Sequence, residues 1–196
     1  MPVFGKGRSK RPNRPAHEKL IERKLGKRII ERRQPWGVRA SDLETVQRNL
    51  GFNFIEEIKQ RLKKQETVNV LDWGCGAGTA ISELGAKFPK KVKAYGCSDT
   101  AYSDWKGKRL AKFIHATKED ALRYFKDKSL DIIYSHYGLL YVKETDYAVR
   151  LAQKLKVGGI LVMDVAPSPK AWADLEKQGF SVKTGNSTRS FIISRQ

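Results

Sequence analysis

A glycine-rich run between a strand and a helix carries the most evident chemistry in the sequence. The run reads Asp72-Trp73-Gly74-Cys75-Gly76-Ala77-Gly78, at the end of a strand predicted over residues 67–72 and before a helix predicted over residues 79–88. Glycines in such a turn let the backbone approach a ligand closely. In an open α/β sheet, ligands bind beyond the carboxyl ends of the strands. We therefore expect a cofactor-binding loop that uses Asp72, Gly74, Gly76 and Gly78.

The spacing of the glycines distinguishes between cofactors. The dinucleotide fingerprint G-x-G-x-x-G would need glycine at positions 74, 76 and 79, but position 79 is threonine. The observed D-x-G-x-G-x-G resembles motif I of the class I S-adenosylmethionine-dependent methyltransferases, where an acidic residue precedes the glycines. A carboxylate at Asp72 suits a cofactor with a cationic amino-acid end, whereas it would repel a pyrophosphate. The resemblance implies S-adenosyl-L-methionine as the cofactor, and no Cys/His spacing suggests a metal site.

Further landmarks follow in the order of the same family. Asp99 comes after the strand predicted over 92–97 and is expected to bind the ribose hydroxyls, although Ser98 stands immediately at the strand end. Glu119 and Asp120 resemble the acidic adenine loop of the family, and the segment 155–161 resembles its Leu-Lys-Pro-Gly-Gly turn, which leads into a strand predicted over 159–164. Each acid, taken singly, equally fits a helix cap or a solvated loop. Taken together, the landmarks imply the family over about residues 65–195.

The methyl acceptor is expected beyond the strand predicted over 130–135. That strand ends in Ser135, a predicted cofactor contact, and His136 and Tyr137 follow it. The Asn/Asp-Pro-Pro-Tyr run typical of exocyclic amine methyltransferases is absent from this segment, as are a cysteine for C5-cytosine chemistry and the Lys-Asp-Lys-Glu set of many ribose methyltransferases. His136 is a candidate general base with Tyr137 as a stacking or hydrogen-bonding partner. A partly buried loop histidine is an equal alternative.

The charge of the chain points to a polyanionic partner. The formal net charge is +18, and residues 1–33 hold 12 Lys/Arg against 3 Glu. Such a field favours nucleic acid first and an anionic membrane second. A basic protein without any nucleic-acid role is the plain alternative. We expect RNA to bind through residues 1–33, with no membrane partner; the sequence leaves the oligomeric state open.

The chain divides into three predicted parts. Residues 1–33 form a basic N-terminal arm whose Ile21, Leu25 and Ile29 predict a helix ending by Gln34. Residues 34–66 form a helical lead-in, opened by a capping box at Ser41. Residues 67–196 form the S-adenosylmethionine-binding domain, in which strands and helices alternate. This alternation predicts an α/β, Rossmann-like, doubly wound and mostly parallel sheet, with the basic helical arm as an N-terminal extension.

The resulting hypothesis is an S-adenosylmethionine-dependent methyltransferase that acts on RNA, ribosomal or transfer. One alternative keeps the enzyme and changes the acceptor to a protein or small molecule. Another is a catalytically inactive nucleic-acid-binding module of the same fold, although the intact glycine loop disfavours it. Two cysteines in different predicted elements favour a reducing cytoplasm, and no apolar run is long enough for a membrane span.

Overall fold

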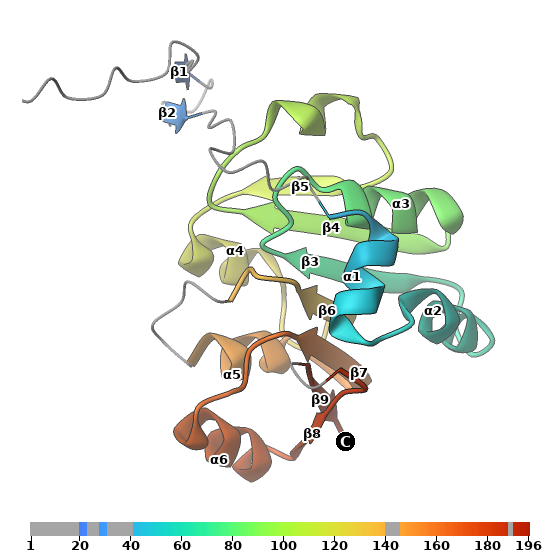
Figure 1. The fold of residues 1–196 in the computed structure, drawn as a ribbon, viewed down its shortest axis with the longest axis vertical. Coiled ribbons are helices and arrows are strands. Elements are labelled where there is room, and N and C mark those ends of the chain that lie inside the picture. The colour runs from blue at the N-terminus through green and yellow to red at the C-terminus, as the bar shows by residue number, and fades with distance from the viewer. Residues whose placement is uncertain (1–19, 23–27, 31–40, 140–145, 188–189) are drawn as a thin grey trace, which may run out of the picture.

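The computed structural model describes residues 20–22, 28–30, 41–139, 146–187 and 190–196 (Figure 1). Its centre is a seven-stranded sheet with the order β5-β4-β3-β6-β7-β9-β8. The strands are β3 (Val68–Trp73), β4 (Val92–Ser98), β5 (Lys112–His115), β6 (Leu130–Ser135), β7 (Leu155–Met163), β8 (Phe180–Thr184) and β9 (Phe191–Arg195). The first five in this spatial order pair in parallel, and β9 is antiparallel to both of its neighbours. The predicted doubly wound, mostly parallel sheet is confirmed.

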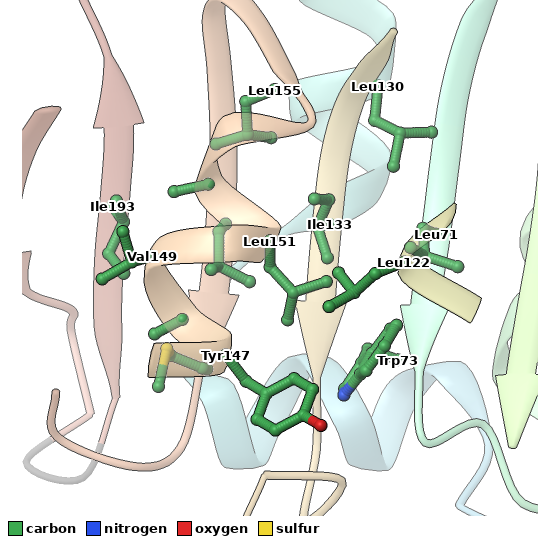
Figure 2. Packing of buried hydrophobic residues seen from close by; sticks show 14 of the residues in the cluster. Leu71, Trp73, Leu122, Leu130, Ile133, Tyr147, Val149, Leu151, Leu155 and Ile193 are labelled. Atoms are coloured by element: carbon green, nitrogen blue, oxygen red, sulfur yellow. The ribbon is translucent and has the colours of Figure 1, made fainter. Parts of the chain in front are cut away.

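Helices cover both faces of the sheet. The buried residues of α1 (Leu43–Leu50), α2 (Phe54–Leu62) and α3 (Thr79–Lys87) share one apolar cluster with one face. Those of α4 (Lys118–Tyr124), α5 (Asp146–Gln153) and α6 (Pro169–Lys177) join the cluster on the other face. Figure 2 shows Leu122, Ile133 and Leu151 packed together in this second cluster. The lead-in helices α1 and α2 are therefore part of the main core.

Alternation along the central strands assigns residues to these two clusters. On β3, Val68 and Val70 belong to the first cluster, whereas Leu71 and Trp73 belong to the second. Every residue of β6 is buried. A strand that is buried on both faces is typical of a parallel sheet covered by two helical layers. This packing fixes the carboxyl ends of β3, β6 and β7 side by side at one edge of the sheet.

The predicted elements of the domain agree with the structure to within one or two residues, with three differences. Strand β7 begins at Leu155 rather than 159, and its pairing with β6 carries an irregularity near Leu130. A 3-10 helix, η1 (Ser103–Gly107), was not expected from the sequence. The cap of α1 is Asp42, which accepts a hydrogen bond from the Thr45 N–H at 2.7 Å. The helix is therefore capped one residue later than Ser41, the predicted cap.

The helix predicted for the basic arm is wrong over its described residues. Leu20–Glu22 (β1) and Arg28–Ile30 (β2) pair as antiparallel strands, with Ile21 opposite Ile29. The helix prediction rested on apolar residues spaced by four. A spacing of four also keeps residues on one face of a strand, because strands repeat every two residues. The β-branched isoleucines then favour the strand. The rest of residues 1–33 lies outside the described part of the structure.

Candidate functional site

The glycine loop joins β3 to α3 in a conformation that requires glycine at three positions. Gly74, Gly76 and Gly78 have φ angles of +83°, +52° and +73°, a region that other L residues adopt only with strain. A Cβ at Gly74 would come within 2.5 Å of the Gly138 backbone, and one at Gly78 would overlap the Phe113 ring. A Cβ at Gly76 would meet only the Tyr102 hydroxyl, at 4.0 Å. Two glycines therefore serve close packing, and Gly76 borders open space.

Asp72 lies at the base of this loop and is buried, with 6% of its surface exposed. Burial raises the pKa of its carboxyl group to about 7, and the nearby Tyr134 hydroxyl offsets part of the rise without reaching full hydrogen-bond geometry. Asp72 does not cap α3, because the cap of that helix is Gly78 and no side chain bonds there. The structural alternative of a helix cap is thus excluded for Asp72.

Three buried polar atoms lie on the last two residues of β6 and on the residue that follows β7. The Tyr134 hydroxyl, the Ser135 hydroxyl and one carboxylate oxygen of Asp164 have no hydrogen-bond partner among the described residues. Leaving such groups unpaired away from water is costly. Together with the space beside Gly76, they fit a polar ligand such as S-adenosylmethionine in this position. A Cβ at Gly138 would lie 2.8 Å from the Ser135 hydroxyl and 3.0 Å from the Gly74 Cα, so Ser135, a predicted cofactor contact, lies next to the glycine loop.

The segment after β4 contacts the glycine loop through two side chains that bond its carbonyl groups. Trp105 of η1 donates a hydrogen bond from Nε1 to the Gly76 carbonyl at 2.9 Å, and its ring stacks on Phe113 at a centroid distance of 5.0 Å. Lys108 donates from Nζ to the Ala77 carbonyl at 2.7 Å. Sequence reasoning missed both residues, because they lie about 30 positions from the loop and only the fold brings them together.

Asp99 follows β4, whose last residue is Ser98. The Asp99 side chain is exposed and accepts a hydrogen bond from the Thr100 hydroxyl at 3.3 Å. The Ser98 hydroxyl instead accepts from the Thr100 backbone N–H at 3.2 Å. Both residues lie at the carboxyl edge beside the glycine loop, because Trp73 pairs with Cys97. Ribose binding by Asp99 stays a prediction.

Glu119 and Asp120, the predicted adenine-loop acids, lie in the first turn of α4 and are engaged in other contacts. Both oxygens of Glu119 accept hydrogen bonds from the Arg150 guanidinium at 2.6 Å, and Oε1 also accepts one from the Tyr147 hydroxyl. These hydrogen bonds to Arg150 and Tyr147 lower the pKa of Glu119 to about 2. Asp120 bonds the Thr117 cap. Both acids thus have structural roles here, and adenine binding by them stays a prediction.

The predicted acceptor residues follow β6 in a tight loop. Tyr137 has a left-handed backbone, with φ at +64°, and half of its surface is exposed. Its N–H donates to Oδ2 of Asp164 at 2.9 Å, which ties this loop to the end of β7. His136 lies next to Tyr137, with ring centroids 4.1 Å apart, and its Nε2 is 3.0 Å from Nδ2 of Asn49 in α1.

Partial burial shifts the pKa values of His136 and Asp164, which also influence each other through their charges. Burial lowers the pKa of His136, and the Asp164 carboxylate acts in the opposite direction. Burial likewise raises the pKa of Asp164. Asn49 and Asp164 were not predicted as site residues. For Asp164 a sequence signal existed, since an acid ends the strand predicted over 159–164; for Asn49 there was none.

Comparison with known proteins agrees with the geometry. Residues 71–163 match the family described as methyltransferase domain. The chain is 24% identical over 119 residues to malonyl-[acyl-carrier protein] O-methyltransferase of Bacillus cereus, an alignment that covers 60% of this chain and 44% of that protein. The same enzyme of Bacillus anthracis is 23% identical over 119 residues, with the same coverage. The chain therefore spans less than half the length of the curated relatives it matches.

Solved structures share the fold. An S-adenosylmethionine-dependent methyltransferase from Listeria monocytogenes gives a TM-score of 0.52 at 15% identity, covering 72% of this chain and 97% of that one. A TehB-like methyltransferase from Corynebacterium glutamicum gives 0.51 at 13% identity, covering 76% and 92%. Residues 71–163 thus match a methyltransferase domain, and the chain shares the fold of S-adenosylmethionine-dependent methyltransferases. This domain and this fold imply S-adenosyl-L-methionine as the cofactor.

The methyltransferase match begins at Leu71 and ends at Met163. It includes the glycine loop, Asp99 and Ser135, whereas Asn49 and Asp164 lie outside it. The predicted acceptor residues His136 and Tyr137 thus contact two residues that the family match does not contain. In the described residues, no helix is long and apolar enough to cross a membrane. The same residues contain no cluster of three or more side chains suited to a metal ion.

Proposed function

We propose that this methyltransferase transfers the methyl group of S-adenosylmethionine to RNA, ribosomal or transfer. The observation that carries the proposal is the net charge of +18, half of which comes from residues 1–33. Lysine and arginine contacts to phosphate supply affinity for RNA without reading its sequence. The catalytic domain then has to place one acceptor atom opposite the sulfonium methyl group.

The cofactor is held, in this proposal, by the glycine loop and the acids around it. S-adenosylmethionine supplies a methyl group that its positively charged sulfur makes electrophilic. Gly76 leaves room for the cofactor, and the buried Asp72 is suited to a cationic group because a nearby positive charge would stabilise its ionised form. Asp99 binds the ribose hydroxyls, and Ser135 donates or accepts one hydrogen bond. Proximity and orientation provide most of the rate enhancement in such a displacement.

On the acceptor side, His136 serves as the base and Tyr137 as a stacking or hydrogen-bonding partner. Because burial lowers its pKa, His136 is neutral near pH 7 and can accept a proton. The Asp164 carboxylate then stabilises the imidazolium that forms. The Asn49 amide occupies Nε2 of His136 at 3.0 Å. An acceptor hydroxyl or amine that uses this nitrogen therefore has to displace Asn49.

Transfer of tritium from labelled S-adenosylmethionine tests the proposal. Total RNA and total protein from cells that lack the gene are incubated separately with the full-length chain. We expect label in the RNA fraction, at a nucleoside that mass spectrometry then identifies. Label in protein alone, with none in RNA, would contradict the RNA acceptor while leaving the methyltransferase intact. The Gly76→Val variant serves as the background.

The role of the arm is tested by deleting residues 1–15, which contain five Lys/Arg. If about four of them contact phosphates, the slope of log affinity for duplex RNA against log salt flattens by about 3–4 units. Cofactor affinity is expected to stay unchanged, since this stretch has few apolar residues for a core. Equal salt slopes for both proteins would show that the arm does not touch the RNA.

A second acceptor class is favoured by one observation. The two curated relatives are named as O-methyltransferases of a malonyl group on acyl-carrier protein. A small acyl group presented by a carrier protein is therefore the alternative acceptor. A carboxylate acceptor has no proton to lose, so His136 would be dispensable there. Tritium found on an acyl-carrier protein, together with an unchanged rate of methyl transfer in His136→Gln, would favour this alternative.

A further inference from the structure

The positive charge outside the arm is unevenly distributed along the chain. Residues 87–128 hold 12 Lys/Arg against 5 Asp/Glu, a net charge of +7. Residues 34–86 carry −1 and residues 129–196 carry +3. The basic segment contains β4, η1 and β5, at the β5 end of the sheet (Figure 1), and α4, whose last residue, Tyr124, lies against Lys112 of β5. One end of the catalytic domain is thus strongly basic.

Ion pairing does not neutralise this end of the domain. Glu119 pairs with Arg150 at 2.6 Å, and Asp127 pairs with Lys154 at 2.6 Å. Both cations come from beyond the basic segment, so two of its five acids are already balanced from outside. Within the described residues, no ion pair uses a lysine or arginine of residues 87–128. Apart from Lys108, which bonds the Ala77 carbonyl, the exposed cations of this segment therefore remain available to a partner.

Strand register brings several of these cations to one face near the amino ends of β4 and β5. Lys112, the first residue of β5, is paired with Tyr95. Lys93 lies two residues before Tyr95 and so shares that face, as does Lys91 just before the strand. The Lys112 nitrogen lies 5.2 Å from the ring centre of Tyr124, at the end of α4. Tyr124 is 48% exposed.

We call the set Lys91, Lys93, Lys112, Arg123, Tyr124 and Lys126 the basic–aromatic surface; all six side chains are exposed. Exposed cations around a half-exposed aromatic ring are typical of sites for single-stranded nucleic acid, where phosphates meet the cations and a base stacks on the ring. A membrane-surface helix would instead show a broad apolar face. The apolar residues of α4, Ala121 and Leu122, are buried in the core.

We infer that the basic–aromatic surface binds a single-stranded segment of the RNA acceptor and directs it along β5 toward the cofactor edge. This inference rests on the proposed RNA function. Strand β5 has four residues, roughly 13 Å at about 3.3 Å per residue. Its far end, His115, contacts the Asp99 carbonyl at 3.2 Å beside the predicted ribose site. A few nucleotides span this distance, so one RNA segment can occupy both places.

Two charge-matched variants of the full-length chain test the surface. The first combines Lys91→Gln, Lys93→Gln and Lys112→Gln. The second combines Lys63→Gln, Lys64→Gln and Lys170→Gln; the first two lysines are exposed in the turn after α2, and Lys170 is exposed on α6. Each variant lowers the net charge from +18 to +15. Binding of a mixed-sequence single-stranded RNA is measured at several salt concentrations, and S-adenosylmethionine binding by calorimetry verifies that both variants are folded.

The first variant is expected to flatten the salt slope by about 2 units, from three single-strand phosphate contacts, whereas the second leaves it nearly unchanged. Tyr124→Ala is expected to weaken RNA binding about 5- to 150-fold, and Tyr124→Phe to retain it. Equal changes of the salt slope in the two lysine variants would overturn the assignment of the basic–aromatic surface as an RNA site, but not the proposed RNA function. Absence of RNA binding by the unmodified chain would overturn both. If the first lysine variant lost binding to phosphatidylserine vesicles while it kept RNA binding, the basic–aromatic surface would be assigned to membranes instead.

Discussion

Asp72 of β3 and Tyr134 of β6 are register partners on neighbouring parallel strands, and both side chains are buried. The carboxyl group therefore faces a phenol instead of water. Burial raises the pKa of Asp72 to about 7, compared with an ordinary value of 3.8. Without a cofactor, the protein thus keeps a proton on this acid up to nearly neutral pH. A cationic cofactor group would favour the ionised form and release that proton.

Replacing Asp72 by asparagine is predicted to stabilise the cofactor-free protein at high pH. The unfolded chain loses the Asp72 proton at a lower pH than the folded one, so the free energy of unfolding falls between about pH 4 and pH 7. Asp72→Asn removes this loss, worth at most about 4 kcal/mol above pH 7, and changes little near pH 3. Urea unfolding at both pH values measures it. A difference independent of pH would contradict the burial of an ionisable carboxyl, and weaker cofactor binding is the expected cost.

His136 is predicted to set the acid limb of the pH–rate profile. Burial lowers its pKa, so activity is expected to fall only below the ordinary histidine range near 6.5. Asp164→Asn removes the carboxylate that favours the imidazolium, which shifts this limb to still lower pH and reduces kcat. His136→Gln is expected to reduce kcat about 100- to 10,000-fold and to abolish the limb. An unchanged profile in His136→Gln would show that the histidine is a structural loop residue.

Trp105 is predicted to position the glycine loop. Trp105→Phe keeps a ring against Phe113 but loses the hydrogen bond to the Gly76 carbonyl. We expect cofactor affinity to fall about 2- to 12-fold, the range of one hydrogen bond. Trp172→Phe is the matched control, because its Nε1 bonds Glu176 within α6. Equal cofactor affinities in the two variants would show that Trp105 acts on the fold alone.

The sequence was sufficient for the sheet and the glycine loop because both rest on local patterns. Alternating apolar strands and the run from Asp72 to Gly78 are readable within a few residues. The helix prediction for the arm failed because a spacing of four residues suits a helix and a strand alike, and only the pairing of Ile21 with Ile29 decides between them.

The acceptor side was only partly predictable because its contacts are long-range. Asn49 reaches His136 across 87 positions, and Asp164 reaches Tyr137 across 27. Glu119 shows the opposite case, since its motif suggested a ligand contact while Arg150, from 31 positions away, takes both of its oxygens. Motifs report which residue types are present, and tertiary packing decides which of them remain free for a ligand.

Asp99 is predicted to bind the ribose of the cofactor. Asp99→Ala should remove charge-assisted hydrogen bonds and weaken cofactor binding by roughly 1.5–3 kcal/mol. Ser98→Ala is the natural comparison, since Ser98 is the last residue of β4 and bonds the Thr100 N–H. Calorimetric titration of both variants decides between them. A larger loss in Ser98→Ala would transfer the role to the serine.

The most direct test is calorimetric titration of the full-length chain with S-adenosylmethionine, for the unmodified protein and for Gly76→Val. A Cβ at Gly76 points into open space that the cofactor is expected to fill. Gly158→Val is the control, because Gly158 also has a positive φ, +74°, and open space around it, but lies at an exposed position of β7, before the buried half of that strand. We predict saturable binding to the unmodified protein and to Gly158→Val, and none to Gly76→Val. No binding to the unmodified protein, or equal affinity in a folded Gly76→Val, would contradict the assignment of the glycine loop as the cofactor site.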